Sequence, residues 1–362
     1  MTKNQKVNKT EETVINFILE GLEKGELIWQ KTGNGATGVL PINHKTKTVY
    51  NGLNCYLTWV ALKRGYVHNE WLTWNQVASM KGLTKAGKGK FFHLEDSDGN
   101  KVKCEKMIKK DEKGNKVKGV KLLKKRDDGE KQKRYPVEYW KLNHREKDTG
   151  KYFTDKDYKK ALKDGTHVRA DFQSWWSLAN VYYVYNVEQT TLPMPKVRKA
   201  KKFKKTGAEK VVEQVYDGYE NAPDFSSMDT GRACYMPMID AVRVPKAEQF
   251  KSKHNGTGGN HYASTCFHEF VHSTGAEKRL SRIGITDLSL FENHKENYAN
   301  EELIAEMGAC MMMAFHNLDT SDTVNNSQAY IKGWLSRLSD DKSLIPVAIR
   351  QSNSAVRHIL GI

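Results

Sequence analysis

The clearest chemical signal in the sequence is the octapeptide TCFHEFVH, in which His268, Glu269 and His272 form an H-E-x-x-H motif. On a helix, His268 and His272 lie one turn apart on the same face, so both imidazoles can bind one Zn²⁺. Glu269 lies beside them and can accept a proton from the attacking water. The motif therefore predicts a zinc-dependent peptidase with one zinc ion per chain.

A catalytic zinc site of this kind needs a third protein ligand and an open position. The acidic and histidine candidates downstream are Glu292, His294, Glu296, Glu301, Glu302 and Glu306. The segment 298–315 is predicted to be a long helix, on which Glu302 and Glu306 lie four residues apart beside an apolar stripe. Carboxylates on such a helix are costly to bury unless a cation or histidine meets them. We assign Glu302 as the third ligand and Glu306 as the carboxylate that orients a ligand histidine, and the reverse assignment stays open.

A neighbouring hydrogen-bond donor would complete the predicted site by steadying the oxyanion of the reaction. Tyr235, in the segment ACYMPMID, is our candidate for this catalytic role, with core packing as its alternative role. A metal-dependent nuclease fits the motif less well, because nucleases usually need Asp-rich sites that often hold two ions.

The elements that must position these residues fall into two groups. The N-terminal half begins with an apolar stripe at helical spacing over residues 11–24, with Thr10 as the expected N-cap. Further helices are predicted up to Gly65 and from Thr73 onward, and short β-like runs follow from Phe91. The C-terminal half is predicted to be mainly helical. The fold class is therefore α+β.

Charge divides the chain into two parts. The 362 residues carry a net charge of +16, but residues 206–362 are net acidic (−5), so the first 205 carry +21. We expect a basic domain over residues 1–192, a basic linker over 193–207 and a second domain over 208–362. The five cysteines contain no C-x-x-C pair, and no apolar run is long enough to span a bilayer. We expect a cytoplasmic protein without a membrane partner, and the sequence carries no signal for an oligomeric state.

Basic and aromatic residues alternate in the first half, as single-stranded nucleic acid requires. Cations can follow the phosphates while aromatic rings stack on bases, and the glycines of LTKAGKGKFF let a basic loop approach a backbone closely. The proposed DNA-binding residues are Lys63, Arg64, Trp74, Lys85, Lys88 and Lys90. Duplex binding is less favoured, because the sequence has no helix-turn-helix, zinc-finger or basic-zipper signature.

The chain resembles the ArdC antirestriction proteins of conjugative plasmids and phages over nearly its whole length. The N-terminal stretches that carry the resemblance are LPINHKTKTVYNGLNCYLTW, RGYVHNEWLTWNQVASMKG, LTKAGKGKFF and VYNVEQT. The C-terminal stretches are ACYMPMIDAVRVPKAEQF, YASTCFHEFVHSTGAEKRLSR, YANEELIAEMGACM and YIKGWLSRL. The resemblance implies a domain that binds single-stranded DNA, followed by a zincin-like metallopeptidase domain.

The resemblance also implies roles for individual residues. His268, His272 and an acidic residue of EELIAE would form the metal site, with Glu269 as the catalytic glutamate. The implied function is sequence-tolerant binding of single-stranded DNA and protection of incoming DNA from host restriction. Two segments depart from the family pattern. Residues 101–165 are longer and richer in lysine, and LTKAGKGK lacks an acidic residue of the family's more usual pattern.

Two hypotheses of different classes follow. The first is a zinc peptidase that a DNA-binding domain brings to an unknown host protein substrate. The second is a non-catalytic protein that coats single-stranded DNA and keeps the metal as a structural or vestigial feature. The intact motif favours the first, because a structural metal site does not need Glu269.

Overall fold

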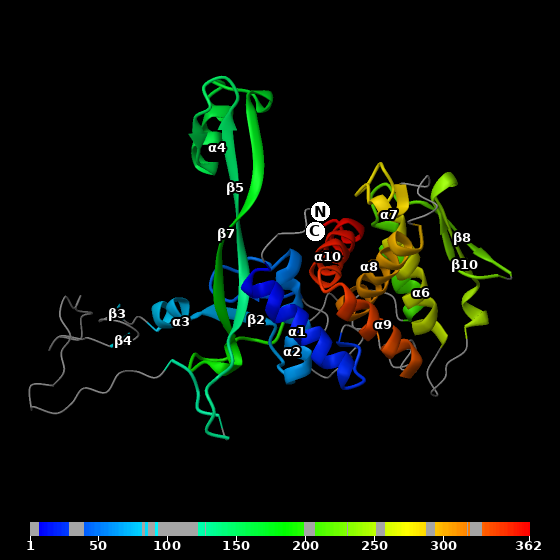
Figure 1. Cartoon of the computed structure of the whole chain (residues 1–362), viewed down its shortest axis with the longest axis horizontal. Coiled ribbons are helices and arrows are strands. Elements are labelled where there is room, and N and C mark those ends of the chain that lie inside the picture. Colours follow the sequence, from blue (N-terminus) through cyan, green and yellow to red (C-terminus); the bar gives the residue numbers. More distant parts are fainter. Residues whose placement is uncertain are drawn as a thin grey trace, which may run out of the picture.

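Two domains of different architecture make up the chain, a sheet with helices in the N-terminal half and a group of helices with a small sheet in the C-terminal half (Figure 1). The computed structural model describes residues 7–28, 40–81, 84–85, 91–92, 122–126, 128–198, 207–229, 231–250, 258–286, 294–316, 318 and 328–362. The predicted α+β fold with two domains is confirmed. No helix in these ranges is long and apolar enough to cross a membrane.

A five-stranded sheet organises the N-terminal half, with the strands in the spatial order β1-β2-β7-β5-β6. The strands are β1 (Ile42–Asn43), β2 (Glu70–Thr73), β5 (Tyr135–Glu146), β6 (Tyr152–Phe153) and β7 (Phe172–Asn186). β1 pairs with β2 in parallel, and every other neighbouring pair is antiparallel. A separate two-stranded ladder joins β3 (Thr84–Lys85) to β4 (Phe91–Phe92).

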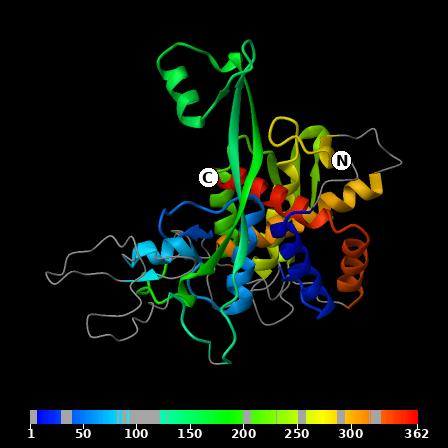
Figure 2. The same cartoon turned by 60° about the vertical axis from the view of Figure 1, so that its left-hand side comes forward.

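The two longest strands of this sheet extend beyond the rest of the molecule. β5 and β7 pair from Tyr135 opposite Val184 to Glu146 opposite Phe172, with one irregularity in the register between Tyr139 and Trp140. Their far end carries β6 and the helix α4 (Asp155–Lys163) (Figures 1 and 2). We call β5, β6, α4 and β7 together the arm.

The other helices of this half begin and end at residues that suit those positions. They are α1 (Lys9–Glu23), the 3-10 helix η2 (Gly52–Tyr56), α2 (Leu57–Arg64) and α3 (Trp74–Met80). α2 ends where Gly65 takes a φ of 69°, and Thr73 caps α3 by accepting a hydrogen bond from the main chain, both as predicted. The prediction that Thr10 is the N-cap of this helix is wrong. Asn8 caps α1 instead, because its side chain and that of Glu11 bond each other's main chain in a capping box.

The C-terminal half surrounds two central helices, α6 (Gly258–Ser273) and α8 (His294–Phe315). The other helices are α5 (Ala208–Asp217), α7 (Ile283–Thr286), α9 (Gln328–Asp340) and α10 (Leu344–Leu360). A three-stranded sheet of order β8-β10-β9 lies beside α6. Its strands are β8 (Asp224–Met228), β9 (Cys234–Met236) and β10 (Ala241–Pro245).

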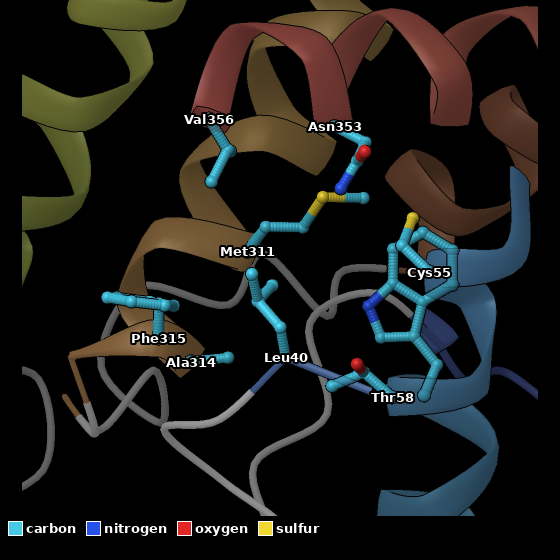
Figure 3. A pocket seen from close by; sticks show the side chains of 9 residues that line it. Leu40, Cys55, Thr58, Met311, Ala314, Phe315, Asn353 and Val356 are labelled. Atoms are coloured by element: carbon cyan, nitrogen blue, oxygen red, sulfur yellow. The ribbon is translucent and has the colours of Figure 1, made fainter. Parts of the chain in front are cut away.

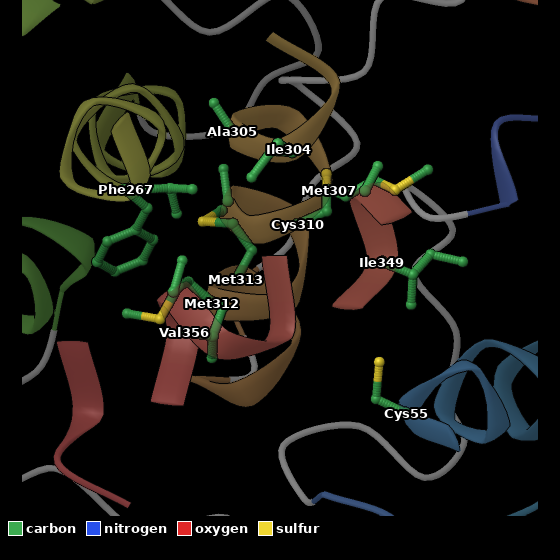
Figure 4. Close-up of a cluster of buried hydrophobic side chains, with 14 of the residues drawn as sticks. Cys55, Phe267, Ile304, Ala305, Met307, Cys310, Met312, Met313, Ile349 and Val356 are labelled. Atoms are coloured by element: carbon green, nitrogen blue, oxygen red, sulfur yellow. The ribbon is translucent and has the colours of Figure 1, made fainter. Parts of the chain in front are cut away.

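One hydrophobic core runs through both halves. Buried side chains of α6, α8 and α10, such as Phe267, Met307, Met312 and Val356, belong to the same cluster as Cys55 from the N-terminal half (Figure 4). Burial of this apolar surface is the main favourable term that holds the two halves together.

Polar contacts from α10 reinforce this shared core. The Arg350 guanidinium lies 2.6 Å from a carboxylate oxygen of Glu138, at the root of the arm, and 2.9 Å from one of Glu11. The Asn353 side chain accepts a hydrogen bond of 2.9 Å from the main chain of Gly52. These contacts thus join the N-terminal half to α10 of the C-terminal half.

A small apolar gap remains where the halves meet. It has a volume of about 30 Å³ and lies between Leu40, Cys55 and Trp59 of the N-terminal half and Met311 and Val356 of the C-terminal half (Figure 3). The two halves therefore leave a small apolar space between them at this point.

The described part of the expected linker lies against the N-terminal half. The guanidinium of Arg198 donates hydrogen bonds to the main-chain oxygens of Leu40 and Asn69, and it forms an ion pair with Glu70 at 3.3 Å. The remaining linker residues, 199–206, lie outside the described ranges.

Helix α8 lies close against helix α6 at Gly308. A Cβ atom built on Gly308 would lie 2.7 Å and 3.0 Å from the two γ-methyl carbons of Val271, which is fully buried. A β-branched side chain in a packed helix has one strongly preferred rotamer, so Val271 has little freedom to move aside. Any side chain at position 308 would push the two helices apart.

We expect Gly308→Ala to lower the free energy of unfolding by about 1–3 kcal/mol, because the cost of overpacking exceeds the better helix propensity of alanine. Gly333→Ala in α9 is the matched control, since a Cβ there meets no atom within 4 Å. The control should be neutral or more stable by up to about 1 kcal/mol. Urea unfolding measures both, and equal stabilities would contradict the close approach.

Candidate metal centre

Three potential metal ligands converge from the two central helices. His268 and His272 lie one turn apart on α6, with their Nε2 atoms 3.0 Å from each other. Glu302 on α8 brings one carboxylate oxygen to 3.3 Å from Nε2 of His268 and the other to 3.4 Å from Nε2 of His272. All the ligand atoms lie within 4.8 Å of one another.

These separations suit a single divalent ion. When each ligand bond measures about 2.0–2.1 Å, two ligands of a tetrahedral zinc ion lie roughly 3.3 Å apart. The side chains of His268 and Glu302 are 27% and 32% exposed, so the cluster is open to solvent on one side. Two histidines, one carboxylate and an open side are the donor set of a catalytic zinc site rather than of a closed structural one.

A buried carboxylate and a buried arginine hold one of these histidines from behind. Nδ1 of His272 lies 3.3 Å from a carboxylate oxygen of Glu301, which is only 2% exposed. Arg282 forms a buried ion pair with the same Glu301. Arg282 also donates hydrogen bonds to the Thr274 hydroxyl at 2.6 Å and the main-chain oxygen of Val271 at 2.7 Å. With Nδ1 held in this way, Nε2 of His272 is directed towards Glu302.

The carboxylate next to Nδ1 of His272 is therefore Glu301, which we did not assign, and the assignment of Glu306 to a ligand histidine stays a prediction. Glu301 and Glu302 are adjacent on α8, so their side chains point about 100° apart around the helix axis. One carboxylate faces the ligand atoms and the other faces the far side of His272. The sequence signal for this arrangement was the adjacent pair of glutamates.

The phenol of Tyr235 is committed to other partners. Its hydroxyl donates a hydrogen bond of 2.8 Å to Asp240 and lies 3.3 Å from a nitrogen of the Arg279 guanidinium. Burial, together with the negative charge of Asp240, raises the pKa of this phenol. The Asp240–Arg279 pair thus engages the Tyr235 hydroxyl in this structure, and the role of Tyr235 as oxyanion donor stays a prediction. The main chain of Tyr235, by contrast, forms a hydrogen bond to Glu269.

Two of the expected DNA-binding side chains have partners inside the protein. The ammonium group of Lys63 lies 3.6 Å from a carboxylate oxygen of Glu26. The Arg64 guanidinium donates a hydrogen bond of 3.1 Å to the Tyr135 hydroxyl. The charge of Lys63 is thus partly neutralised by Glu26, and the Arg64 guanidinium is held in place by Tyr135.

The other four expected DNA-binding residues lie at or beyond the edge of the described chain. The Trp74 ring is half-buried, with its centroid 6.1 Å from that of Tyr185. Lys85 lies on β3, and Lys88 and Lys90 lie outside the described residues. A DNA-binding role for these residues stays a prediction.

Comparison with known proteins agrees with the geometry of both halves. Residues 8–170 match the N-terminal domain of the anti-restriction factor ArdC, and residues 221–351 match a zincin-like metallopeptidase domain. The chain is an ArdC-like protein. No curated protein matches it significantly.

Two solved structures share the fold of this ArdC-like chain. One is the metal-free crystal structure of the antirestriction ArdC protein from the R388 plasmid, with 22% identity, 97% coverage of both chains and a TM-score of 0.57. The other is the Mn(II)-bound structure of that protein, with 21% identity, 98% coverage of both chains and a TM-score of 0.56. The ligand cluster in a zincin-like domain indicates a divalent metal site.

Strong electrostatic coupling marks the ligand cluster of the ArdC-like chain. Burial disfavours the charged form of His272, but hydrogen bonds to Glu301 and Glu302 outweigh it and raise the pKa of His272 to about 9. Burial likewise disfavours the Glu302 carboxylate, but His268 and His272 hold its pKa well below the usual range. Without a metal, His272 is therefore protonated at neutral pH. A metal ion must displace that proton, so metal affinity should rise as the pH rises towards 9.

Glu269 lies beside the ligands in a different environment. Its side chain is 7% exposed, and burial raises the pKa of its carboxyl group, partly offset by the positive charges of His268 and His272. A carboxyl group with a raised pKa is a better proton acceptor, because its pKa lies closer to neutral pH. The position and the pKa of Glu269 suit proton transfer rather than metal ligation.

We expect Glu301→Gln to weaken metal binding by about 10- to 100-fold, because it removes the charge that holds Nδ1 of His272. Glu277→Gln is the matched control, because Glu277 is exposed in the same half of the chain, and it should bind metal within about threefold of the wild type. Competition with a fluorescent zinc chelator measures both affinities. Equal metal affinities of Glu301→Gln and Glu277→Gln would contradict the contact described above.

Proposed function

We propose that this ArdC-like chain is an antirestriction protein of a mobile element. In this proposal it binds single-stranded DNA without sequence preference, carries a zinc-dependent peptidase site, and protects incoming DNA from host restriction. The observation that carries the peptidase function is the cluster of His268, His272 and Glu302, with the buried Glu269 next to it on α6. Both structural relatives are of an antirestriction protein, which supports the biological role.

The residues of the cluster suit peptide hydrolysis. His268, His272 and Glu302 would hold one Zn²⁺ per chain, because two imidazoles and a carboxylate form a common catalytic zinc set. When bound, the ion supplies the Lewis acidity that polarises a scissile carbonyl. Glu269 accepts the proton of the attacking water on its carboxylate and returns it to the leaving amine.

The small sheet offers a way to align a peptide substrate. In the described part of the sheet, β9 is an edge strand that pairs with β10 alone. The main chain of Tyr235 in the middle of β9 reaches Glu269. An extended peptide that pairs with the free edge of β9 would pass the ligand cluster, since main-chain hydrogen bonds of this kind bind peptides of many sequences.

The basic half supports the DNA-binding part of the proposal. Residues 1–205 carry a net charge of +21, which favours a polyanion as partner. Single strands are preferred over duplexes in this proposal, because exposed aromatic side chains can stack only on bases that have left a duplex.

The peptidase proposal predicts that metal binding and turnover separate by residue. Glu269→Gln should keep about one zinc ion per chain and lose at least ~10²-fold in turnover, because the proton acceptor is gone. His268→Ala should lose the metal as well, since it removes one of three ligands. Elemental analysis measures the metal, and cleavage of a peptide library derived from a bacterial proteome measures turnover. Zinc-loaded wild type without any cleavage would instead support a DNA-coating protein with a structural metal.

The DNA-binding proposal predicts a preference that depends on salt. The full chain should bind a fluorescent oligo-dT more tightly than a duplex of equal length. The affinity should fall as salt rises from 50 to 200 mM, by a log–log slope of about 0.7 per phosphate contact. Fluorescence anisotropy measures both, and tighter duplex binding or a flat salt dependence would overturn the proposal.

A further inference from the structure

The arm separates its charges between its two faces. β7 contains no charged residue, and β5 contains four, Glu138, Lys141, Arg145 and Glu146. Side chains alternate between the faces of a strand, so Lys141 and Arg145 share one face and both glutamates lie on the other. We call the face with Lys141 and Arg145 the cationic face.

Two pairs of exposed rings lie on the cationic face. The centroids of Tyr139 and Tyr182 lie 5.9 Å apart, and the two side chains are 52% and 44% exposed. The centroids of Tyr152 and Trp175 lie 6.0 Å apart, and Tyr152 is 66% exposed. Both pairs leave ring surface open to solvent.

Cations and polar groups lie between and beside these rings. The Arg145 guanidinium lies 5.8 Å from the centroid of Tyr152. In the strand register, Trp175 lies opposite Asn143, four residues from Tyr139, so the two ring pairs are about 13 Å apart along the arm. Lys141 occupies the position between Tyr139 and Asn143. Rings alternate with cations along this face.

The opposite face is covered only in part, since Trp140 and Trp176 are exposed there, but its two carboxylates are paired. At the far end, Tyr158 of α4 stacks on His144 at 3.7 Å between centroids, so α4 covers that face and leaves the cationic face open. Glu138 is paired with Arg350, and Glu146 lies 2.9 Å from a ring nitrogen of His167. The cationic face itself carries no carboxylate on either β5 or β7.

We propose that the cationic face of the arm is the surface on which single-stranded DNA stacks. This inference rests on the proposed DNA-binding function and gives it a location that the sequence did not suggest. Bases stack on the ring pairs Tyr139–Tyr182 and Tyr152–Trp175, while Lys141 and Arg145 meet the phosphates between them. Charge complementarity favours a polyanion over a protein partner, because the rings are interrupted by cations and not surrounded by further apolar side chains.

The test uses the full chain and fluorescein-labelled oligo-dT of about 20 nucleotides. Tyr139→Ala/Tyr152→Ala should weaken binding at least tenfold, because one stacking ring is lost from each pair. Tyr139→Phe/Tyr152→Phe keeps both rings and should bind like the wild type. Trp176→Ala is the matched control, since Trp176 is 63% exposed but lies on the opposite face, and it should also bind like the wild type.

The charges are tested separately through the salt dependence. Lys141→Gln/Arg145→Gln should reduce the log–log salt slope by about 1.4, which is 0.7 for each of two phosphate contacts. All of these side chains lie on the surface of the arm, and thermal unfolding of each variant should match that of the wild type.

The outcomes distinguish this inference from the function on which it rests. If wild type fails to bind oligo-dT, the proposed function is wrong and the inference falls with it. If wild type binds and Tyr139→Ala/Tyr152→Ala binds equally well, only the location on the arm is wrong. If Trp176→Ala weakens binding as much as the double variant, the assignment to the cationic face is overturned.

Discussion

The close approach of α8 to α6 is the constraint on which the metal centre depends. Gly308 lets the backbone of α8 lie against the buried Val271, and at this separation Glu302 lies within 3.4 Å of Nε2 of both histidines of α6. Glu302 is partly buried, and a carboxylate there would be costly without a positive partner. The partner is either a protonated histidine or a metal ion, so the helix packing and the ligand chemistry support each other.

The Arg282–Glu301 pair lies behind the metal ligands and orients one of them. A buried ion pair is weak evidence for stability, because desolvation offsets much of its Coulomb energy. Its contribution here is orientation. Arg282 follows α6 in the chain and donates a hydrogen bond to the main-chain oxygen of Val271 near the end of α6. It also forms an ion pair with Glu301 on α8, and Glu301 contacts His272. The ligand histidine is thus held by the same contact that joins the two helices.

Helix α10 contacts both the arm and the helix that carries Glu302. On one side, Arg350 of α10 meets Glu138 at the root of the arm. On the other side, the Ser352 hydroxyl donates a hydrogen bond of 2.8 Å to the main-chain oxygen of Ile304 on α8. Glu138 is almost fully buried and needs this positive partner. The two proposed activities therefore sit on one continuous body, although the charge of the chain changes sign between its halves.

Local signals in the sequence were enough for much of this protein. The H-E-x-x-H spacing placed two imidazoles on one helical face, and Gly65 and Thr73 marked helix ends, because such features depend on contacts within a few residues. The fold class and the family also followed from the sequence. Thr10 was misjudged as a cap because Asn8 and Glu11, also local, compete for the same main-chain groups and form the better pair.

Only the tertiary structure decided which distant side chains meet. Whether Glu301 or Glu306 faces His272 depends on the rotation and axial position of α8 relative to α6, and helical spacing alone does not define either. Likewise, the hydrogen bond from Tyr235 to Asp240, which is also paired with Arg279, joins residues that helical or strand spacing does not bring together. The rings of the arm become a surface because strand register aligns residues that lie more than 20 positions apart in the chain. Pairings of this kind arise from packing between residues far apart in the chain. A single sequence shows which residue types are present but not which of them meet.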